Sequence, residues 1–217
     1  MPEVYLEMWH CNSTGVYSGV MANGNGDSSD ESNLDNTFLR GIQKTDTDGV
    51  AQFLTTFPGH YTSRATHIHL LVHTNAERFC NGTLGNAVSA SHVGQAFFDQ
   101  DLITAVEKVS PYNTNTQEIT ANAKDQILEQ EAASVDPFHQ YTLLGDNVED
   151  GIFAWIAFGI NTTYASSVTP AAFLYTGGGV ANSAGGGGMG GGGGAPASNG
   201  PGPGNGTAPG NGTASLQ

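Results

Sequence analysis

Apolar and polar residues alternate along several segments in the first hundred positions of the chain. Alternation with β-branched and aromatic residues is typical of strands that bury one face of a sheet. The segments with this pattern are residues 4–10, 37–43, 50–57, 66–73 and 93–98. Gly, Asn, Asp and Pro are concentrated between them, as in the exposed loop expected at 21–35. The pattern therefore predicts short strands joined by turns and loops.

The pattern changes after residue 98. Residues 99–109 carry apolar side chains at helical spacing behind an Asp that can cap a helix, and 120–133 form a second, more polar helix candidate. The run IFAWIAFGI at 152–160 is apolar throughout, so we expect a strand buried on both faces, and 164–169 suggest one more. This order favours a mainly β fold: an antiparallel β-sandwich with long loops and one or two inserted helices.

The composition changes again near residue 177. Residues 177–217 are rich in Gly, Pro and Asn and carry no charged side chain. Such a segment buries too little apolar surface to offset its ordering entropy, so we expect a disordered, low-complexity tail. The remaining residues, 1–176, are enough for one β-sandwich domain.

The chain is strongly acidic, with six Lys plus Arg against twenty Asp plus Glu and a formal net charge of −14. Nucleic acid and anionic membrane surfaces require cationic patches, so neither is an expected partner. Its longest apolar run is also far too short to span a bilayer. No feature of the sequence specifies an oligomeric state.

Two cysteines and five glycosylation sequons suggest an extracellular protein. Cys11 and Cys80 fit neither a metal finger nor a Cys-x-x-Cys pair, and the even count is consistent with one Cys11–Cys80 disulfide. The sequons begin at Asn12, Asn81, Asn161, Asn205 and Asn211. No signal peptide precedes residue 4, so we expect a secreted chain whose N-terminus is incomplete here.

Candidate chemistry begins with the sequence RATHIHLLVH at 64–73. On a strand, His67 and His69 project to the same face about 6.5–7 Å apart at the backbone, close enough to converge on one metal ion. Taken alone, the same pair is equally compatible with two histidines on a polar strand face.

Two tyrosines extend this candidate site. Tyr17 ends the turn after the first strand, and Tyr61 lies on the turn that precedes the histidines. A tyrosine is normally a packed aromatic, and it binds metal only after losing a proton whose reference pKa is about 10. Ferric iron is a strong enough Lewis acid for this, whereas zinc usually prefers nitrogen and sulfur donors.

Several blocks of sequence then occur in an order that is specific as a set. They are WHCNSTGVYSG at 9–19, FLRGIQKTDTDGVAQFLTTFPGHY at 38–61, RATHIH at 64–69 and VGQAFFD at 93–99, followed by PYNTNTQ from 111 and LLGDNVEDGIFAW from 143. With these blocks the chain resembles the intradiol ring-cleavage dioxygenase family, particularly its secreted fungal branch. The resemblance covers roughly residues 3–170.

The resemblance implies one non-haem Fe(III) per chain and six site residues. The iron ligands would be Tyr17, Tyr61, His67 and His69, with Arg64 and Gln95 beside them. The family inserts both atoms of O₂ into a small aromatic diol of the catechol or hydroxyquinol type, which gives a muconate-type diacid.

Three of these residues have expected roles in the reaction. Tyr61, on a turn, would accept a proton from the diol, Arg64 would face negative charge that develops on the substrate, and Gln95 would hydrogen-bond in the same pocket. His10, His60 and His73 are interpreted as structural or outer residues.

Two alternatives remain open at this point. One is a secreted β-sandwich that binds the metal and has lost turnover. The other is a zinc hydrolase built on His67 and His69, which lacks an evident third ligand and carboxylate base.

Overall fold

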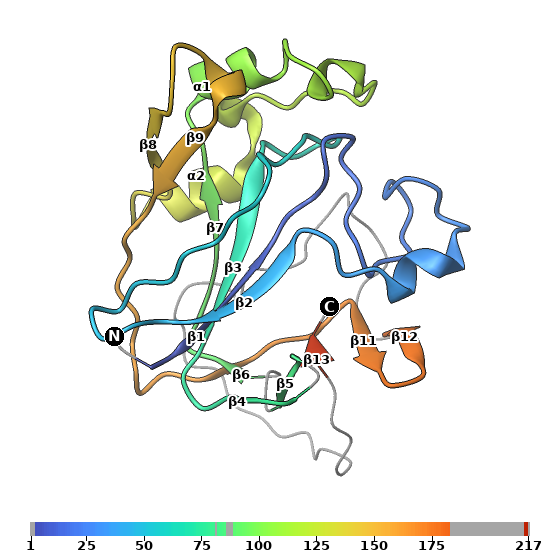
Figure 1. Cartoon of the computed structure of the whole chain (residues 1–217), viewed down its shortest axis with the longest axis vertical. Coiled ribbons are helices and arrows are strands. Elements are labelled where there is room, and N and C mark those ends of the chain that lie inside the picture. The colour runs from blue at the N-terminus through green and yellow to red at the C-terminus, as the bar shows by residue number, and fades with distance from the viewer. Residues whose placement is uncertain (1–2, 81, 86–88, 183–214, 217) are drawn as a thin grey trace.

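A four-stranded sheet forms the centre of the computed structural model, which describes residues 3–80, 82–85, 89–182 and 215–216 (Figure 1). Its strands are β1 (Tyr5–Trp9), β2 (Arg40–Lys44), β3 (His67–His73) and β7 (His92–Phe97), in the order β2-β1-β3-β7. Each neighbouring pair is antiparallel. The sheet thus brings together strands that lie up to ninety positions apart in the sequence.

One face of this sheet packs on the main hydrophobic core. Met8, Ile68, Leu70 and Ala96 are buried there against apolar side chains of α1 (Gln100–Val106). Residues of the hairpin β8 (Gln140–Leu143) and β9 (Ile152–Trp155) cover the same core, and Figure 1 shows α1 and this hairpin together at one end of the molecule. The alternate residues of β3, including His67 and His69, consequently project from the other face.

Both predicted helices are present and shorter than expected. Asp99 caps α1 by accepting the Leu102 N–H at 2.7 Å. Helix α2 (Gln126–Ala132) begins only after Asp125, whose backbone is extended (φ −87°, ψ 113°). The preceding residues form the short 3₁₀ helix η3 (Asn122–Lys124) instead of an earlier helical turn.

Smaller elements complete the described chain. The 3₁₀ helices are η1 (Glu31–Asp35), η2 (Tyr112–Thr114) and η4 (Val148–Asp150). Short antiparallel pairs join β4 (Glu77–Arg78) to β5 (Leu84–Gly85), β6 (Ser89–Ala90) to β10 (Ser166–Ser167), and β11 (Ala172–Tyr175) to β12 (Gly178–Ala181) and β13 (Ser215–Leu216). The mainly β, antiparallel fold with two inserted helices is therefore confirmed.

The predicted low-complexity tail lies mostly outside the described residues. Of 177–217, the structure describes 177–182 and 215–216. Strand β12 continues the hairpin that begins with β11, and Gly179 N–H donates to Asp35 at 2.7 Å. Ordered structure thus extends a few residues past the position where the composition changes.

The strand predicted at 50–57 is wrong. This segment is extended but pairs with no other strand in the part of the chain that the structure describes. Its hydrogen bonds use single groups, such as the Thr55 hydroxyl with His10 and the Phe57 carbonyl with the Tyr112 hydroxyl. Phe53 and Phe57 pack on the core while Leu54 is fully exposed. The alternating sequence therefore reflects one buried side of an extended segment that forms no backbone hydrogen-bond ladder with another strand in the described part of the chain.

The strand predicted to be buried on both faces at 152–160 is also wrong in that respect. Strand β9 ends at Trp155, and burial alternates along it. Phe153 is 58% exposed and Trp155 44% exposed, whereas Ile152 and Ala154 contact the core. An edge hairpin buries one face only, so continuous apolar sequence did not mean complete burial.

The predicted Cys11–Cys80 disulfide is not formed in the structure. Cys11 is buried and its thiol donates to the Gly59 carbonyl at 3.3 Å, whereas Cys80 is exposed. Each is a free thiol, so Cys11 acts as a small packing residue at the base of the two tyrosine turns.

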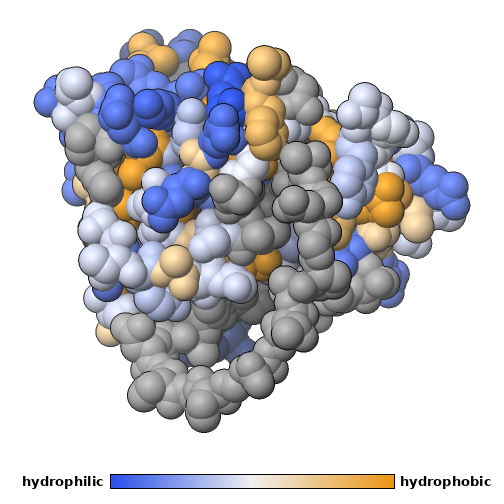
Figure 2. All heavy atoms as spheres, turned by 90° about the horizontal axis from the view of Figure 1, so that it is seen from below, coloured by the Kyte–Doolittle hydropathy of each residue, from blue (hydrophilic) through white to orange (hydrophobic). Residues whose placement is uncertain are grey.

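The view from below shows a largely hydrophilic surface (Figure 2). Viewed from below, hydrophilic side chains cover much of the coloured surface and apolar ones form small separate groups (Figure 2). Among the described residues, no helix combines the length and the apolar character needed to cross a membrane.

Candidate metal centre

Four of the predicted site residues converge on one point. The hydroxyls of Tyr17 and Tyr61 each lie 3.4 Å from Nε2 of His67, and Nε2 of His69 lies 3.2 Å from the same atom. Tyr17, Tyr61 and His67 are at most 5% exposed. Two phenol oxygens and two imidazole nitrogens therefore share one buried space.

The histidines are placed by the central sheet. His67 and His69 occupy alternate positions on β3, which is hydrogen-bonded to β1 on one side and β7 on the other. The Nδ1 atom of His67 lies 2.6 Å from the Ala65 carbonyl, which can only accept, so Nδ1 carries the proton. Nε2 of His67 is therefore unprotonated, and its lone pair faces the space that it shares with the other three candidate metal-binding atoms, as a metal ligand requires.

Tyr17 is placed by a loop that the sequence analysis interpreted only as exposed. Asn25 accepts the Tyr17 N–H at 2.6 Å, and its amide donates to the Tyr17 carbonyl at 2.9 Å. The amide of Asn33 donates to the same carbonyl at 2.9 Å. Both asparagines are buried, so part of the 21–35 loop folds inwards to hold the backbone of Tyr17.

The turns that carry the two tyrosines pack directly on one another. A Cβ on Gly59 would lie 2.3 Å from the Asn12 carbonyl oxygen, and one on Gly15 would lie 2.3 Å from the His60 carbonyl oxygen. Both clashes are with backbone atoms, which cannot move aside as a flexible side chain does. Glycine at these positions lets the two backbones approach closely enough for the phenols to meet.

A third segment joins these two turns. The side chain of Gln117 donates to the Thr14 carbonyl at 2.8 Å and accepts the Thr62 N–H at 3.3 Å. The amide of Asn115 in the same way donates to one carbonyl in each turn. The PYNTNTQ stretch thus links the two tyrosine turns through side-chain hydrogen bonds to the backbone of each.

Arg64 and Gln95, the other two candidate site residues, are adjacent to two of the four donors in the backbone pairing. Arg64 forms an isolated antiparallel bridge with Tyr61, and Gln95 lies opposite His69 in the register of β3 and β7. The Nη2 group of Arg64 donates to the Gln95 side-chain oxygen, and its Nε donates to Asp125 at 2.9 Å. Sequence reasoning missed Asp125, because the helix was predicted at 120–133 and this residue lay inside it, whereas α2 begins only after Asp125.

Trp9 forms an aromatic wall of the site. Its ring centroid is 4.8 Å from that of Tyr17 and 5.9 Å from that of His69. The guanidinium of Arg40 lies over the Trp9 ring, 5.0 Å from its centroid, and forms an ion pair with buried Glu7. The cross-strand register of β1, β2 and β3 places these side chains in one row.

The three histidines that the sequence analysis interpreted as structural or outer residues are His10, His60 and His73. Every ring nitrogen of these three has a partner other than the four donors. The partners are the Cys11 carbonyl and Thr55 for His10, Glu107 and the Gln117 carbonyl for His60, and Glu7 and the Ser89 carbonyl for His73.

Burial sets the protonation of the four donors. It raises the pKa of Tyr17 well above its ordinary value and the pKa of Tyr61 to about 12. It also lowers the pKa of His67 to about 3 and the pKa of His69 well below its ordinary value. The imidazoles are therefore neutral, as ligation requires, and only a strongly charged cation would stabilise phenolates here.

The donor set fits ferric iron better than zinc. In the described part of the chain, no group of three or more His, Cys, Asp or Glu is placed to hold a metal ion. The histidine pair is completed only by phenols, which are hard anionic donors once deprotonated. The third nitrogen, sulfur or carboxylate ligand of a zinc hydrolase is thus not found among these residues.

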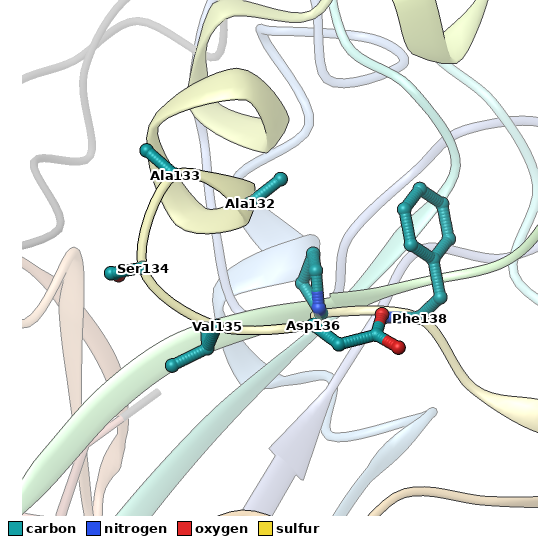
Figure 3. Close-up of a pocket in the computed structure, with 7 residues that line it drawn as sticks. Ala132, Ala133, Ser134, Val135, Asp136 and Phe138 are labelled. Carbon is teal, nitrogen blue, oxygen red and sulfur yellow. The ribbon is translucent and has the colours of Figure 1, made fainter.

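An open hollow lies elsewhere, where the chain leaves α2. It measures about 490 Å³ and is lined by residues 132–138, which lie at the end of α2 and along the turn that follows it (Figure 3). Its lining contains none of the six predicted site residues. Convergence of donors, rather than hollow size, therefore marks the candidate site.

Comparison with known proteins gives structural relatives only. No protein-family model matches the chain, and no curated protein matches it. An intradiol ring-cleavage dioxygenase from Tetranychus urticae matches with a TM-score of 0.58 and 25% identity, over 76% of this chain and 74% of that one. A second solved structure, described as a dioxygenase, matches equally well over 76% of this chain and 73% of its own. The chain thus shares a fold with dioxygenases, which supports an oxygenase; the secreted fungal branch stays a prediction.

Proposed function

We propose that this chain is a non-haem Fe(III) dioxygenase that cleaves a catechol- or hydroxyquinol-type diol between its two hydroxyls. The observation that carries the proposal is that the hydroxyls of Tyr17 and Tyr61 and the Nε2 atom of His69 all lie within 3.4 Å of Nε2 of His67. The described dioxygenase activity of the structural relatives supports the same reaction.

Tyr17, Tyr61, His67 and His69 would hold the iron. Two phenolates and two neutral imidazoles leave a ferric site with a net charge of about +1, which suits a dianionic catecholate. When bound, the ion would supply Lewis acidity and make the aromatic diol reactive towards O₂.

The chain itself would orient the substrate and move its protons. Tyr61 lies on a turn with a single bridge to Arg64, outside the ladder that holds the histidines of β3, and it would accept a proton from the diol. Arg64, held by Gln95 and Asp125, would face negative charge that develops on the ring. Trp9 covers Tyr17 and His69 and would help to exclude water.

Iron content and the visible spectrum test the proposal. Iron-loaded protein should bind one ion per chain and show a tyrosinate-to-iron charge-transfer band, and O₂ uptake should follow addition of a catechol. Tyr17→Phe should weaken iron binding by at least about 10–100-fold, the range for lost partners of a metal site. The matched control is Tyr164→Phe, at a tyrosine that is 44% exposed.

The outcomes separate the alternatives. A colourless iron-loaded protein, or a Tyr17→Phe variant identical to Tyr164→Phe, would sink the site assignment. A coloured protein that consumes no O₂ with any catechol tested would indicate a binding protein that lacks turnover. Stoichiometric zinc with hydrolytic activity would revive the zinc alternative.

We also propose that the protein is secreted and glycosylated. Among the sequon asparagines that the structure describes, Asn161 is exposed, and its side-chain oxygen accepts the N–H and the hydroxyl of Thr163. Expression in a secreting eukaryotic host, followed by glycosidase treatment, tests this. A protein whose electrophoretic mobility does not change on treatment would count against it.

A further inference from the structure

Asp125 carries four hydrogen bonds on one buried carboxylate. Its Oδ1 accepts the Ile127 and Leu128 N–H groups at 2.8 and 2.9 Å, which caps α2. Its Oδ2 accepts the Arg64 Nε–H at 2.9 Å and the Ala65 N–H at 2.7 Å. One oxygen thus serves the helix, and the other serves the segment that leads into the metal centre.

Two paths run from Oδ2 to the candidate site. The first passes through Arg64, whose other end donates to Gln95. The second passes through Ala65, because its N–H is held by Asp125 while its carbonyl accepts the Nδ1–H of His67. The same carboxylate therefore restrains both the cation beside the site and the peptide that orients a ligand.

The charge of Asp125 matters as well as its shape. The Asp125 side chain is fully buried, and the Arg64 side chain is 12% exposed. Burial raises the pKa of Asp125, but the Leu128 and Ala65 N–H groups and the Arg64 guanidinium outweigh this and leave the pKa below its ordinary value. A buried arginine without this partner would lose both its charge compensation and its fixed orientation.

We propose that Asp125 is a positioning residue for the metal centre: it holds Arg64 against Gln95 and holds the Ala65 peptide against His67. The inference rests on the proposed dioxygenase function and deepens it. Asp125 touches neither the metal donors nor the space between them, so it acts through its two neighbours. Helix α2 is thereby tied to the site through its first turn.

The test compares Asp125→Asn with Asp99→Asn. Both aspartates cap a seven-residue helix, and Asp99 accepts the Leu102 N–H at 2.7 Å on α1 without contacting Arg64 or Ala65. In either variant the asparagine keeps one oxygen to cap its helix. At position 125 it also replaces Oδ2 with an NH₂ group, which cannot accept the N–H groups of Arg64 and Ala65. The pair of variants therefore separates capping from positioning.

Three readouts are measured on iron-loaded protein: iron stoichiometry, the charge-transfer spectrum, and kcat and KM for O₂ uptake with catechol. We expect Asp125→Asn to bind iron, to shift the charge-transfer maximum, and to lower kcat by about 10–100-fold. Asp99→Asn should keep the wild-type spectrum and change kcat by less than about 3-fold. Equal effects of the two variants on all three readouts would overturn the proposal.

A second variant keeps the test decisive if Asp125→Asn does not fold. Asp125→Ser retains a good helix cap, yet its shorter side chain cannot reach Arg64. It should fold and reproduce the spectral shift and the lower kcat; a wild-type spectrum and kcat would refute positioning. Failure of the proposed function is recognised separately, because the wild-type protein itself would then show no charge-transfer band or no O₂ uptake.

Discussion

The two halves of the candidate metal centre are held in different ways. His67 and His69 lie on β3, an inner strand with a ladder of backbone hydrogen bonds on both sides. Tyr17 and Tyr61 lie on turns outside that sheet, which are held by side-chain amides and by backbone contacts at two glycines. The histidine half is thus part of the element on which the fold depends, and the tyrosine half is supported from outside it.

Because of this difference, we expect the stability of the fold and the affinity for metal to respond to different substitutions. Changes beneath the histidine strand should lower the free energy of unfolding before they alter the donors. Changes around the tyrosine turns should weaken metal binding at a smaller cost to the fold. Three variants test this contrast.

The largest loss of stability is expected in the sheet, at Glu7. This carboxylate is 1% exposed and pairs with Arg40 and His73. Glu7→Gln should lower the free energy of unfolding at pH 7 by about 3 kcal/mol, since it leaves the guanidinium of Arg40 without its buried anionic partner. Chemical denaturation measures this, and Glu3→Gln, in the exposed pair with Lys44, should cost no more than about 0.5 kcal/mol.

The loss at Glu7 should depend on pH. Burial raises the pKa of Glu7, but Arg40 and His73 outweigh this and leave it below the ordinary value of 4.5. A lowered folded pKa means that the carboxylate stabilises the protein fully above pH 4.5 and less as the pH falls through its folded pKa. Wild type and Glu7→Gln should therefore converge in stability at acid pH. A gap that stays constant from pH 7 to pH 3 would contradict this.

A smaller loss is expected where the tyrosine turns meet, at Gly59. A methyl group there would lie 2.3 Å from the Asn12 carbonyl oxygen, so Gly59→Ala should push the turns apart and cost about 2 kcal/mol. Iron affinity should fall by more than the stability loss predicts. Gly159→Ala is the control, since a Cβ there meets nothing within 4 Å. Unchanged iron affinity in Gly59→Ala would remove the distinction between the two halves.

The smallest loss of stability is expected at Asn25. Asn25→Ala removes the buried amide that holds both backbone groups of Tyr17 and should cost about 1.5 kcal/mol. Its charge-transfer band should broaden or shift, because the Tyr17 backbone gains freedom. Asn23→Ala, at an exposed asparagine of the same loop, should leave both the spectrum and the unfolding curve unchanged. The comparison weakens if the two variants behave alike.

The same contrast explains what could be predicted from the sequence. Alternation identifies a strand and the face of each residue, so the convergence of His67 and His69 followed from two-residue spacing. The positions of Tyr17 and Tyr61 came from the resemblance of ordered blocks, because no local pattern joins two turns that are distant in sequence. Alternation also misled at 50–57, where it reports one buried side but cannot report whether a neighbouring strand is available.

The supports of the site were largely invisible. Asn25 and Asn33 stand in a polar loop whose composition indicates exposure, and only the folded chain shows that they turn inwards. Asp125 lay inside the helix predicted at 120–133, and neither its capping role nor the contact of its second oxygen with a residue sixty positions away could be seen there. Side-chain contacts to distant backbone have no short-range signature, and this is why the candidate ligands could be named from the sequence while the residues that hold them could not.

The register between β1 and β3 also determines when the donors come together during folding. Tyr17 and His67 are fifty positions apart, and they approach only after the sheet has paired strands that are distant in the chain. Closing such long loops is slow, because chain entropy is lost before the contacts between the distant segments contribute favourable free energy. The proposed iron would therefore meet donors that the folded polypeptide has already brought together, and it would be loaded onto the finished protein instead of guiding its folding.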